Sequence, residues 1–336
     1  MPETRVTVVV PTLAADSAYL ECLQSLARQT RKDIRVVVVD NSGSGRVSRG
    51  AVAEFGAEVM ESGRNLGFGA AINLAWRHSD TAYLATLNDD AVAQPGWMEA
   101  LLRQMEEDSR AGMCASRVCL ASGGIDSAGM LISGDGTSKQ RGQGDPPSRW
   151  EAPGEVLCPS GSAAIYRRAM LDEIGLFDED FFLYCEDTDL GLRARRAGWR
   201  CLYVPGAVVE HRYSHSAGRA SPLKAYLVER NRLFVVVKNF PLSMLLRVPF
   251  HGVVRYFWHA VALVRGEGAA GQFRHEGNSA GTLPWLVVRA HCALLSSLAR
   301  LLRQRRAIRG KARLSAGEFT RLLHEYWISP RQVAGL

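Results

Sequence analysis

Residues 5–10 read RVTVVV and residues 34–39 read IRVVVV, and these two runs decide the fold. Both are dominated by β-branched apolar residues, which is typical of strands that are buried on both faces. Residues 18–29, between them, carry leucines at helical spacing. Further strands are expected at 58–60 and 83–87, and further helices at about 69–78 and after Pro95. Such alternation predicts an α/β fold: a mostly parallel, Rossmann-like sheet with helices on both faces.

Composition narrows the class of protein. The chain has 336 residues, of which 47% are hydrophobic and 22% charged, so it can bury a sizeable core and is neither disordered nor collagen-like. Its seven cysteines are odd in number and form no C-x-x-C pair, which indicates reduced thiols in a cytosol rather than a disulfide framework or a zinc ribbon. Residues 1–5 carry no apolar run, so we expect no secretory signal and a cytoplasmic protein.

Charge divides the chain into two parts. Residues 1–240 hold 27 Lys and Arg against 30 Asp and Glu, whereas residues 241–336 hold 14 against 4. We therefore predict one domain over 1–240 and a basic helical region over 241–336. Within the first, a Gly-, Ser- and Pro-rich insert over 121–154, which we expect to form a long loop or a small hairpin, separates residues 1–120 from residues 155–240.

Polar residues follow three of the predicted strands. Thr12, Asp40-Asn41 and Asn88-Asp89-Asp90 stand where ligands bind in open α/β sheets, beyond the carboxyl ends of the strands. Residues 63–69, GRNLGFG, form a glycine-rich turn that opens a helix and is suited to a phosphate. This turn lacks the G-K-[ST] of a Walker loop and the G-x-G-x-x-G of a dinucleotide dehydrogenase.

Three further features have both a functional and a structural interpretation. Paired acids such as Asp89-Asp90 suit a hard cation, Mg²⁺ or Mn²⁺, or begin a turn. The acids of residues 186–189 provide a general base, or stabilise the start of a helix through its dipole. His211, at the end of an apolar strand, is a metal ligand or a structural histidine. The residues alone leave these alternatives open.

The order of these motifs, together with Gly161-Ser162-Ala163 and Phe177–Phe182, resembles the family 2 inverting glycosyltransferases, in their bacterial rhamnosyltransferase-like branch. The resemblance covers about residues 5–240 and implies that 1–240 is a catalytic domain of GT-A fold. It implies a nucleotide-binding half over about 1–120 and an acceptor half over 155–240. It implies that Asp187 is the catalytic base, that Asp90 and His211 hold Mg²⁺ or Mn²⁺, and that Glu186 and Asp189 lie on the acceptor side. The residues that it places around the nucleotide sugar are Pro11, Thr12, Asp40, Asn41, Arg64, Asn65, Gly67, Asn88 and Asp89.

The implied reaction moves a sugar from a nucleoside diphosphate donor, dTDP-rhamnose in this branch, to a hydroxyl of a glycan or polyprenyl-linked acceptor in surface polysaccharide synthesis. Asn88 replaces the first acid of the family's D-x-D motif and removes one charged ligand. A non-catalytic nucleotide-sugar-binding membrane scaffold and a glycosyltransferase for a soluble small molecule are the alternatives.

The basic region contains two amphipathic helical stretches, residues 242–264 and 285–306. Neither has 18 uncharged apolar residues, so we expect no membrane-spanning helix. Basic helices that carry Trp and Phe are typical of the bilayer interface, and we predict peripheral contact with an anionic membrane on the inner face of the cell membrane. A helical bundle or a homo-oligomer contact is the alternative, and no nucleic-acid-binding module is recognisable.

Overall fold

The computed structural model describes residues 4–211 and 221–335. Within these residues the chain forms two compact units, an α/β unit of residues 4–130 and 140–211 and a helical unit of residues 131–139 and 221–335. Our predicted domain boundary at residue 240 lies one helix after the start of the helical unit. The helix between the two points, α7 (Pro222–Asn239), packs along α11 within the helical unit.

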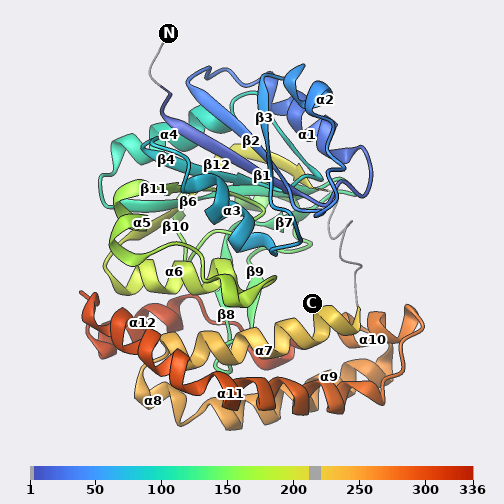
Figure 1. Ribbon diagram of the computed structural model, residues 1–336. Coiled ribbons are helices and arrows are strands. Elements are labelled where there is room, and N and C mark those ends of the chain that lie inside the picture. The colour runs from blue at the N-terminus through green and yellow to red at the C-terminus, as the bar shows by residue number, and fades with distance from the viewer. Residues whose placement is uncertain (1–3, 212–220, 336) are drawn as a thin grey trace. The chain divides into compact units, whose positions relative to one another are not determined.

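A ten-stranded sheet organises the α/β unit (Figure 1). Its main path runs β10-β12-β6-β11-β4-β1-β2-β3, with β5 added beside β12 and β7 beside β6. The strands are β1 (Val6–Thr12), β2 (Ile34–Asp40), β3 (Ala57–Glu61), β4 (Tyr83–Leu87), β5 (Ala91–Ala93), β6 (Ala111–Leu120), β7 (Ile125–Ser127), β10 (Gly154–Glu155), β11 (Ala163–Arg167) and β12 (Arg200–His211).

The predicted α/β class is confirmed, and the sheet is mixed. The pairs that β1 forms with β2 and β4, the pair β2-β3 and the pair β6-β12 are parallel. β11 runs antiparallel between β4 and β6. This reversal brings the start of β11 beside the carboxyl end of β4, where Ala163 pairs with Leu87. The polar residues that follow β4 therefore meet the turn that precedes β11.

Successive side chains of β1 point to opposite faces of the sheet, and both faces are buried, which explains why consecutive positions are apolar. Val8 and Val10 belong to one buried cluster, and Val9 belongs to the cluster on the opposite face. Helices cover both faces. α1 (Ala18–Ala27) and α4 (Trp97–Glu107) pack in the first cluster, and α3 (Phe68–Trp76), α5 (Arg168–Ile174) and α6 (Glu186–Arg196) pack in the second. A short helix, α2 (Arg49–Ala53), was not predicted.

The insert over 121–154 is ordered structure. It begins with β7, continues through the hairpin of β8 (Met130–Ile132) and β9 (Ser138–Gln140), and ends in the 3₁₀ turn η1 (Pro147–Trp150). The small-hairpin form of the prediction is the one observed.

The helical unit contains α7, α8 (Leu242–Leu245), α9 (Val248–Arg265), α10 (Gly268–His275), α11 (Thr282–Gly310), α12 (Ala316–Glu325) and α13 (Pro330–Gly335). α7 packs along α11, and α9 packs against α10 and α13. The tip of the hairpin is joined to this unit by Ile132, whose N–H donates to the carbonyl of Tyr326 at 3.0 Å and whose carbonyl accepts from Ile328 at 3.0 Å.

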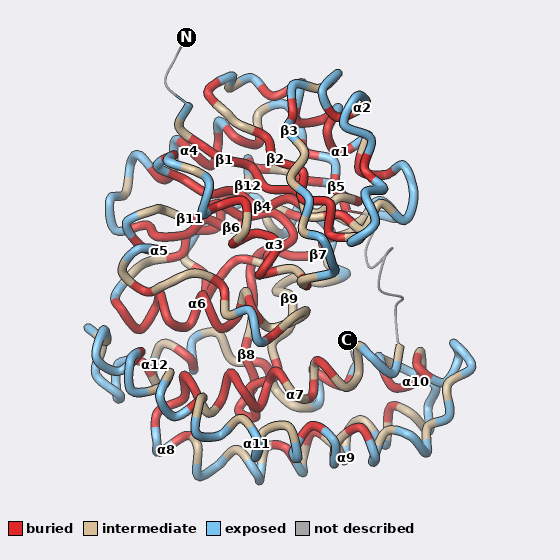
Figure 2. The backbone as a smooth tube through the Cα atoms, viewed as in Figure 1, coloured by how far each residue is buried: buried red, intermediate tan, exposed pale blue. Residues whose placement is uncertain are grey.

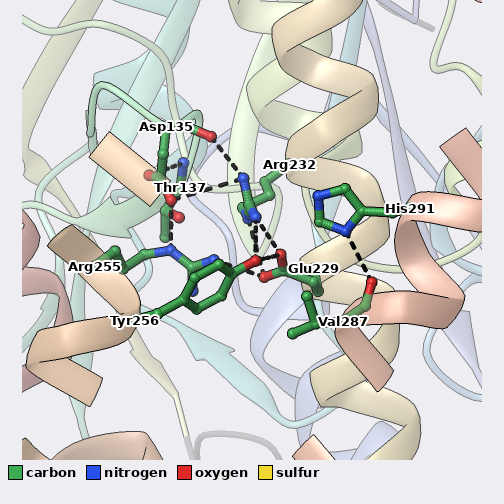
Figure 3. Close-up of polar contacts among 8 residues, drawn as sticks. All are labelled: Asp135, Thr137, Glu229, Arg232, Arg255, Tyr256, Val287 and His291. Carbon is green, nitrogen blue, oxygen red and sulfur yellow. Dashed lines mark hydrogen bonds and ion pairs between the residues drawn. The ribbon is translucent and has the colours of Figure 1, made fainter. Parts of the chain in front are cut away.

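A buried network of charges lies at the centre of the helical unit (Figure 3). Arg255 donates to both Asp135 and Glu229, with its Nη2 at 2.7 Å from Glu229 Oε2. Arg232 donates from Nε to Glu229 Oε2 at 3.0 Å and from Nη1 to the backbone carbonyl of Asp135 at 3.1 Å. Burial alone would raise the pKa of Glu229, but the two arginines lower it to about 2. Two buried acids thus balance two buried arginines, and they tie the hairpin to α7 and α9.

Candidate functional site

The first parts of the site are the ends of β1 and β2. These strands pair in register, so Thr12 lies opposite Asp40. The Thr12 hydroxyl donates to Asp89 Oδ2 at 2.6 Å and so joins the end of β1 to the residues that follow β4. Burial raises the pKa of Asp89 to about 6, against the lowering effect of the Thr12 hydrogen bond and with a further increase from Asp90.

Asp40 and Asn41 support the surrounding loops. Asp40 is 1% exposed and accepts from the Ser42 N–H at 3.0 Å, the Ser42 hydroxyl at 2.6 Å and the Val47 N–H at 2.9 Å. Burial alone would raise the pKa of Asp40, but these hydrogen bonds lower it below its ordinary value. Asn41 Oδ1 accepts from the Leu66 N–H at 2.8 Å, and its Nδ2 donates to the Gly67 carbonyl at 3.1 Å.

The glycine-rich turn depends on Gly67. Its φ is +82°, and a Cβ added there would lie 2.0 Å from the carbonyl oxygen of Phe182. Asn65 Oδ1 accepts from the Gly67 N–H at 2.9 Å, and the Phe68 N–H donates to that same Phe182 carbonyl at 2.8 Å. Arg64 is exposed, with its backbone against Gly43. The turn is thereby joined to the segment that precedes α6.

A histidine between two carboxylates forms the second part of the site. His211 ends β12, opposite Ala91 in the antiparallel pair with β5. Its Nε2 lies 3.1 Å from Asp90 Oδ1 and 3.2 Å from Asn88 Nδ2, and its Nδ1 lies 2.9 Å from Asp126 Oδ2. Burial alone would lower the pKa of His211, but hydrogen bonds and charges from Asp126 and Asp90 raise it to about 9.

Asp126 was not among the residues predicted from the sequence. It lies on β7, inside the insert, and is 2% exposed. The sequence offers only a single Asp in a Gly- and Ser-rich stretch, and the pairing of β7 with β6 brings it to His211. A carboxylate that accepts from Nδ1–H is the usual partner of a metal-binding histidine, whose Nε2 ligates the ion once it has released its proton.

The donor set fits a divalent cation only in part. Asp90 supplies carboxylate oxygen and His211 supplies imidazole nitrogen, both compatible with Mn²⁺ or Mg²⁺. Among residues 4–211 and 221–335, no group of three or more His, Cys, Asp and Glu side chains converges to hold a metal ion. A cation at this point therefore requires further ligands, which the oxygens of a diphosphate can supply.

Asp187 lies in the first turn of α6. Its Oδ2 accepts from the Gly161 N–H at 3.0 Å, and its Oδ1 accepts from the Thr188 N–H at 2.6 Å. Burial raises the pKa of Asp187, and these hydrogen bonds oppose the increase. A carboxylate that is held in place and has a raised pKa is suited to accept a proton.

Strained backbone precedes this carboxylate. Phe182, Tyr184 and Cys185 have φ values of 64°, 72° and 67°, in the left-handed region that non-glycine residues rarely adopt. Such residues cluster at functional sites, where the surrounding structure holds them. Here they turn the chain sharply, so that Phe182 reaches the glycine-rich turn and α6 begins at Glu186.

The other two acids of this cluster face different surroundings. Glu186 is 6% exposed, and its Oε2 has no hydrogen-bond partner. Burial, with a smaller contribution from Asp187, raises its pKa to about 8, so it is neutral at pH 7. Asp189 has no exposed surface and accepts from Arg193 Nε at 2.9 Å. Arg193 in turn donates to three consecutive carbonyls that begin at the last residue of α5, so Asp189 holds two segments together and offers no surface to an acceptor.

Hydrogen bonds at two neighbouring residues, Gly161 and Ser162, connect the segment that contains Asp90 to the start of α6. The Asn88 N–H donates to the Ser162 carbonyl at 2.9 Å, and the neighbouring Gly161 N–H donates to Asp187. Asp90, two residues after Asn88, and Asp187, one hydrogen bond from Gly161, thus border the same turn before β11. The structure brings together residues that are about a hundred positions apart in the sequence.

Comparison with known proteins identifies the family to which the chain belongs. The model of the family described as glycosyltransferase like family 2 matches residues 2–234. The chain belongs to this family. This glycosyltransferase is 31% identical over 252 residues to the N-acetylglucosaminyl-diphospho-decaprenol L-rhamnosyltransferase of Mycobacterium tuberculosis, covering 66% of this chain and 82% of that one. The predicted membership and the resemblance to rhamnosyltransferases are confirmed.

Solved structures support the fold. GalNAc-T7, solved with UDP, GalNAc and Mn²⁺, superposes with a TM-score of 0.58 at 14% identity, covering 88% of this glycosyltransferase and 58% of that chain. Residues 1–349 of TarS from S. aureus superpose with a TM-score of 0.52 at 17% identity, covering 96% and 91%. The predicted GT-A fold is thereby confirmed.

Proposed function

We propose that this glycosyltransferase moves one sugar from a nucleoside diphosphate donor to a hydroxyl of a lipid-linked glycan, with inversion at the anomeric carbon. The observation that carries the proposal is the shared turn of Asn88, Ser162 and Gly161, which borders Asp90 on one side and Asp187 on the other. The similarity to the mycobacterial rhamnosyltransferase supports rhamnose as the sugar and a polyprenyl-diphosphate-linked acceptor. We propose dTDP-rhamnose as the donor.

Asp187 is the base in this proposal. Its two oxygens are held by Gly161 and Thr188, which fixes the direction from which it approaches a bound acceptor hydroxyl. The carboxylate takes the hydroxyl proton as the oxygen attacks the anomeric carbon on the face opposite the leaving diphosphate. A single displacement inverts the configuration and needs no second carboxylate as nucleophile.

The leaving group accumulates negative charge on its β-phosphate. Asp90 and His211 are the residues that would hold Mg²⁺ or Mn²⁺, and a bound ion would supply positive charge to a departing diphosphate. Asp126 keeps His211 oriented, with Nε2 toward Asp90. Arg64 provides a further positive charge on the exposed turn.

The other residues that we predict around the nucleotide sugar include several whose side chains are held by neighbouring residues. Thr12, Asp40, Asn41 and Asn65 are held by hydrogen bonds to neighbouring residues, so we assign them to shaping the donor pocket. The full set that we propose around the nucleotide sugar remains Pro11, Thr12, Asp40, Asn41, Arg64, Asn65, Gly67, Asn88 and Asp89. Glu186, neutral and next to Asp187, remains our proposal for the acceptor side.

A lipid-linked acceptor implies an enzyme that works at the cytoplasmic face of the cell membrane. We propose a peripheral location there, and the helical unit supplies the surface that is argued below.

Transfer assays test the proposal. The enzyme is incubated with dTDP-rhamnose and a short-chain prenyl-diphosphate GlcNAc, with and without EDTA, and the anomeric configuration of the product is read by NMR. We expect an inverted product that is lost with EDTA and restored by Mn²⁺ or Mg²⁺. In Asp187→Asn we expect donor binding by calorimetry to persist while turnover falls at least about a thousandfold. Turnover by this variant within tenfold of wild type removes Asp187 from the role of base.

The same assay separates the alternatives. A non-catalytic scaffold binds donor but neither transfers nor hydrolyses it under any metal condition. A glycosyltransferase for small molecules modifies soluble hydroxyl acceptors and leaves the prenyl-linked sugar unchanged.

A further inference from the structure

The helical unit exposes large apolar side chains along α9. Phe250, Val253 and Phe257 are 68%, 66% and 59% exposed, and Val264 is 85% exposed. Their spacing of three, four and seven residues places all four on one face of the helix. Leu246, two residues before α9, is 78% exposed. Figure 2 shows the mixture of exposed and intermediate residues that α9 and α11 carry along their length.

A second row follows α11. Trp285, Val288 and Leu295 are 65%, 51% and 70% exposed, and Leu302 is 44% exposed. These positions, with exposed Cys292 between them, follow one another at steps of three, four, three and seven residues and again share one helical face. A row of large apolar side chains that stay exposed along one helical face indicates an interaction site.

Charge along these helices has a single sign. Residues 242–265 and 282–310 together contain nine arginines and no Asp or Glu. Arg303, Arg306 and Arg309, in the last turns of α11, are exposed. The apolar row of α11 therefore ends in a basic row on the same helix. Such a surface matches an anionic partner that also offers an apolar interior.

We propose that α9 and α11 lie flat in the headgroup region of an anionic bilayer, with the two apolar rows inserted and the arginines on lipid phosphates. The choice of a lipid surface as occupant rests on the proposed function, in which the acceptor is lipid-linked. A row of aromatic and aliphatic side chains supplies apolar burial, and each arginine near the surface adds electrostatic attraction that salt weakens.

The structure favours a helix in the plane of the membrane over one that crosses it. By length and composition alone, α11 is apolar enough to span, which differs from our expectation because only Arg289 interrupts its first 18 residues. Its other side, however, packs along α7. Arg305 Nη1 donates to the Val237 carbonyl at 2.8 Å, and the Arg289 guanidinium lies 4.2 Å from the centre of the Tyr226 ring. A crossing helix would have to give up these contacts in lipid.

Vesicle binding by the full-length enzyme tests the proposal. We expect sedimentation with vesicles of phosphatidylglycerol and phosphatidylcholine, weaker binding as salt increases, and little binding to phosphatidylcholine alone. The double variant Phe257→Glu, Leu295→Glu removes two exposed side chains without touching the core, and we expect it to bind at least tenfold more weakly. Leu223→Glu, at a position 58% exposed on α7, is the matched control and is expected to bind like wild type.

Cys292 reports the depth of insertion. It is the exposed cysteine of the described chain, and it lies within the α11 row. A solvatochromic dye attached there is expected to shift to the blue on anionic vesicles and to be quenched by lipids brominated near the headgroup. Extraction of the enzyme by alkaline carbonate is expected for a helix in the plane, whereas retention after carbonate contradicts it.

Other results overturn the proposal. Equal binding of the double variant and wild type, or equal binding to neutral and anionic vesicles, excludes this surface. A stable dimer in sedimentation velocity that the double variant converts to a monomer, without vesicle binding by either, assigns the rows to a second copy. Binding needs no donor, and transfer to a water-soluble short-chain acceptor needs no membrane, so failure of the surface and failure of the proposed reaction are read separately.

Discussion

The contact between Asp126 and His211 leads to a quantitative prediction about cation binding. Asp126 Oδ2 lies 2.9 Å from His211 Nδ1, and the two residues are 2% and 6% exposed. Asp126→Ala removes the acceptor for Nδ1–H, so the imidazole is free to turn its Nε2 away from Asp90. Partners of this kind are worth about tenfold to a hundredfold in metal affinity, or about 1.4 to 2.7 kcal/mol.

The measurement is the dissociation constant of Mn²⁺, followed by electron paramagnetic resonance in the presence of a nucleoside diphosphate. We expect about a tenfold to hundredfold weakening in Asp126→Ala and a smaller loss in Asp126→Asn, since the amide oxygen still accepts a hydrogen bond. Asp33→Asn is the control. Asp33 is also a buried acid, 7% exposed, but its partner is Arg31 at 2.9 Å, outside the site.

Folding of each variant is checked by circular dichroism and by its melting temperature, so that lost affinity is not confused with lost structure. An Asp126→Ala enzyme that is folded and binds Mn²⁺ within threefold of wild type would refute the reasoning. Such a result would mean that His211 is oriented without Asp126 or that it does not ligate the cation.

Three further outcomes are expected. Because the pKa of Glu186 is raised to about 8 in the folded state, the folded protein binds the extra proton, and its free energy of unfolding falls as pH rises from about 5 to 8. Glu186→Gln should flatten that decline in chemical denaturation, and an unchanged slope contradicts it. Gly67→Ala should lower the free energy of unfolding by about 2 kcal/mol or more, because its Cβ would lie 2.0 Å from a carbonyl oxygen, whereas Gly63→Ala, with open space around it, should cost only about 1 kcal/mol. Arg255→Met leaves Glu229 and its neighbouring acid with one arginine, and should cost about 3 to 5 kcal/mol, less at pH 4 than at pH 7 as the acids take up protons; a loss below 1 kcal/mol in calorimetry would show that the network is not needed.

Much of the fold is readable from local pattern. The valine runs of β1 and β2 predict strands buried on both faces, and the structure places alternate valines in two separate clusters. The ends of β1, β2 and β4 identify Thr12, Asp40 and Asn88 as neighbours, because parallel strands leave the sheet at the same edge. These features depend on residues close together in the sequence, so the sequence alone is enough to predict them.

The assembly of the site depends on the tertiary structure. Asp126 comes from a short strand within a loop-like insert, and no local pattern distinguishes it from any surface acid. Asp189 looks like its neighbour Asp187 in sequence, yet one accepts from a buried Arg193 and the other from the Gly161 backbone. Sequence shows that an acid is present, but its pKa and its role are set by burial and by partners that long-range strand pairing brings to it.

The same division applies to the C-terminal region. Amphipathic periodicity and an excess of arginine are visible in the sequence, and they determine that the region is helical and basic. Which face remains exposed was decided by packing, since α7 covers one side of α11 and leaves Trp285 and Leu295 uncovered. A periodic pattern specifies that a helix has an apolar face, whereas only the folded chain specifies whether another helix has already buried it.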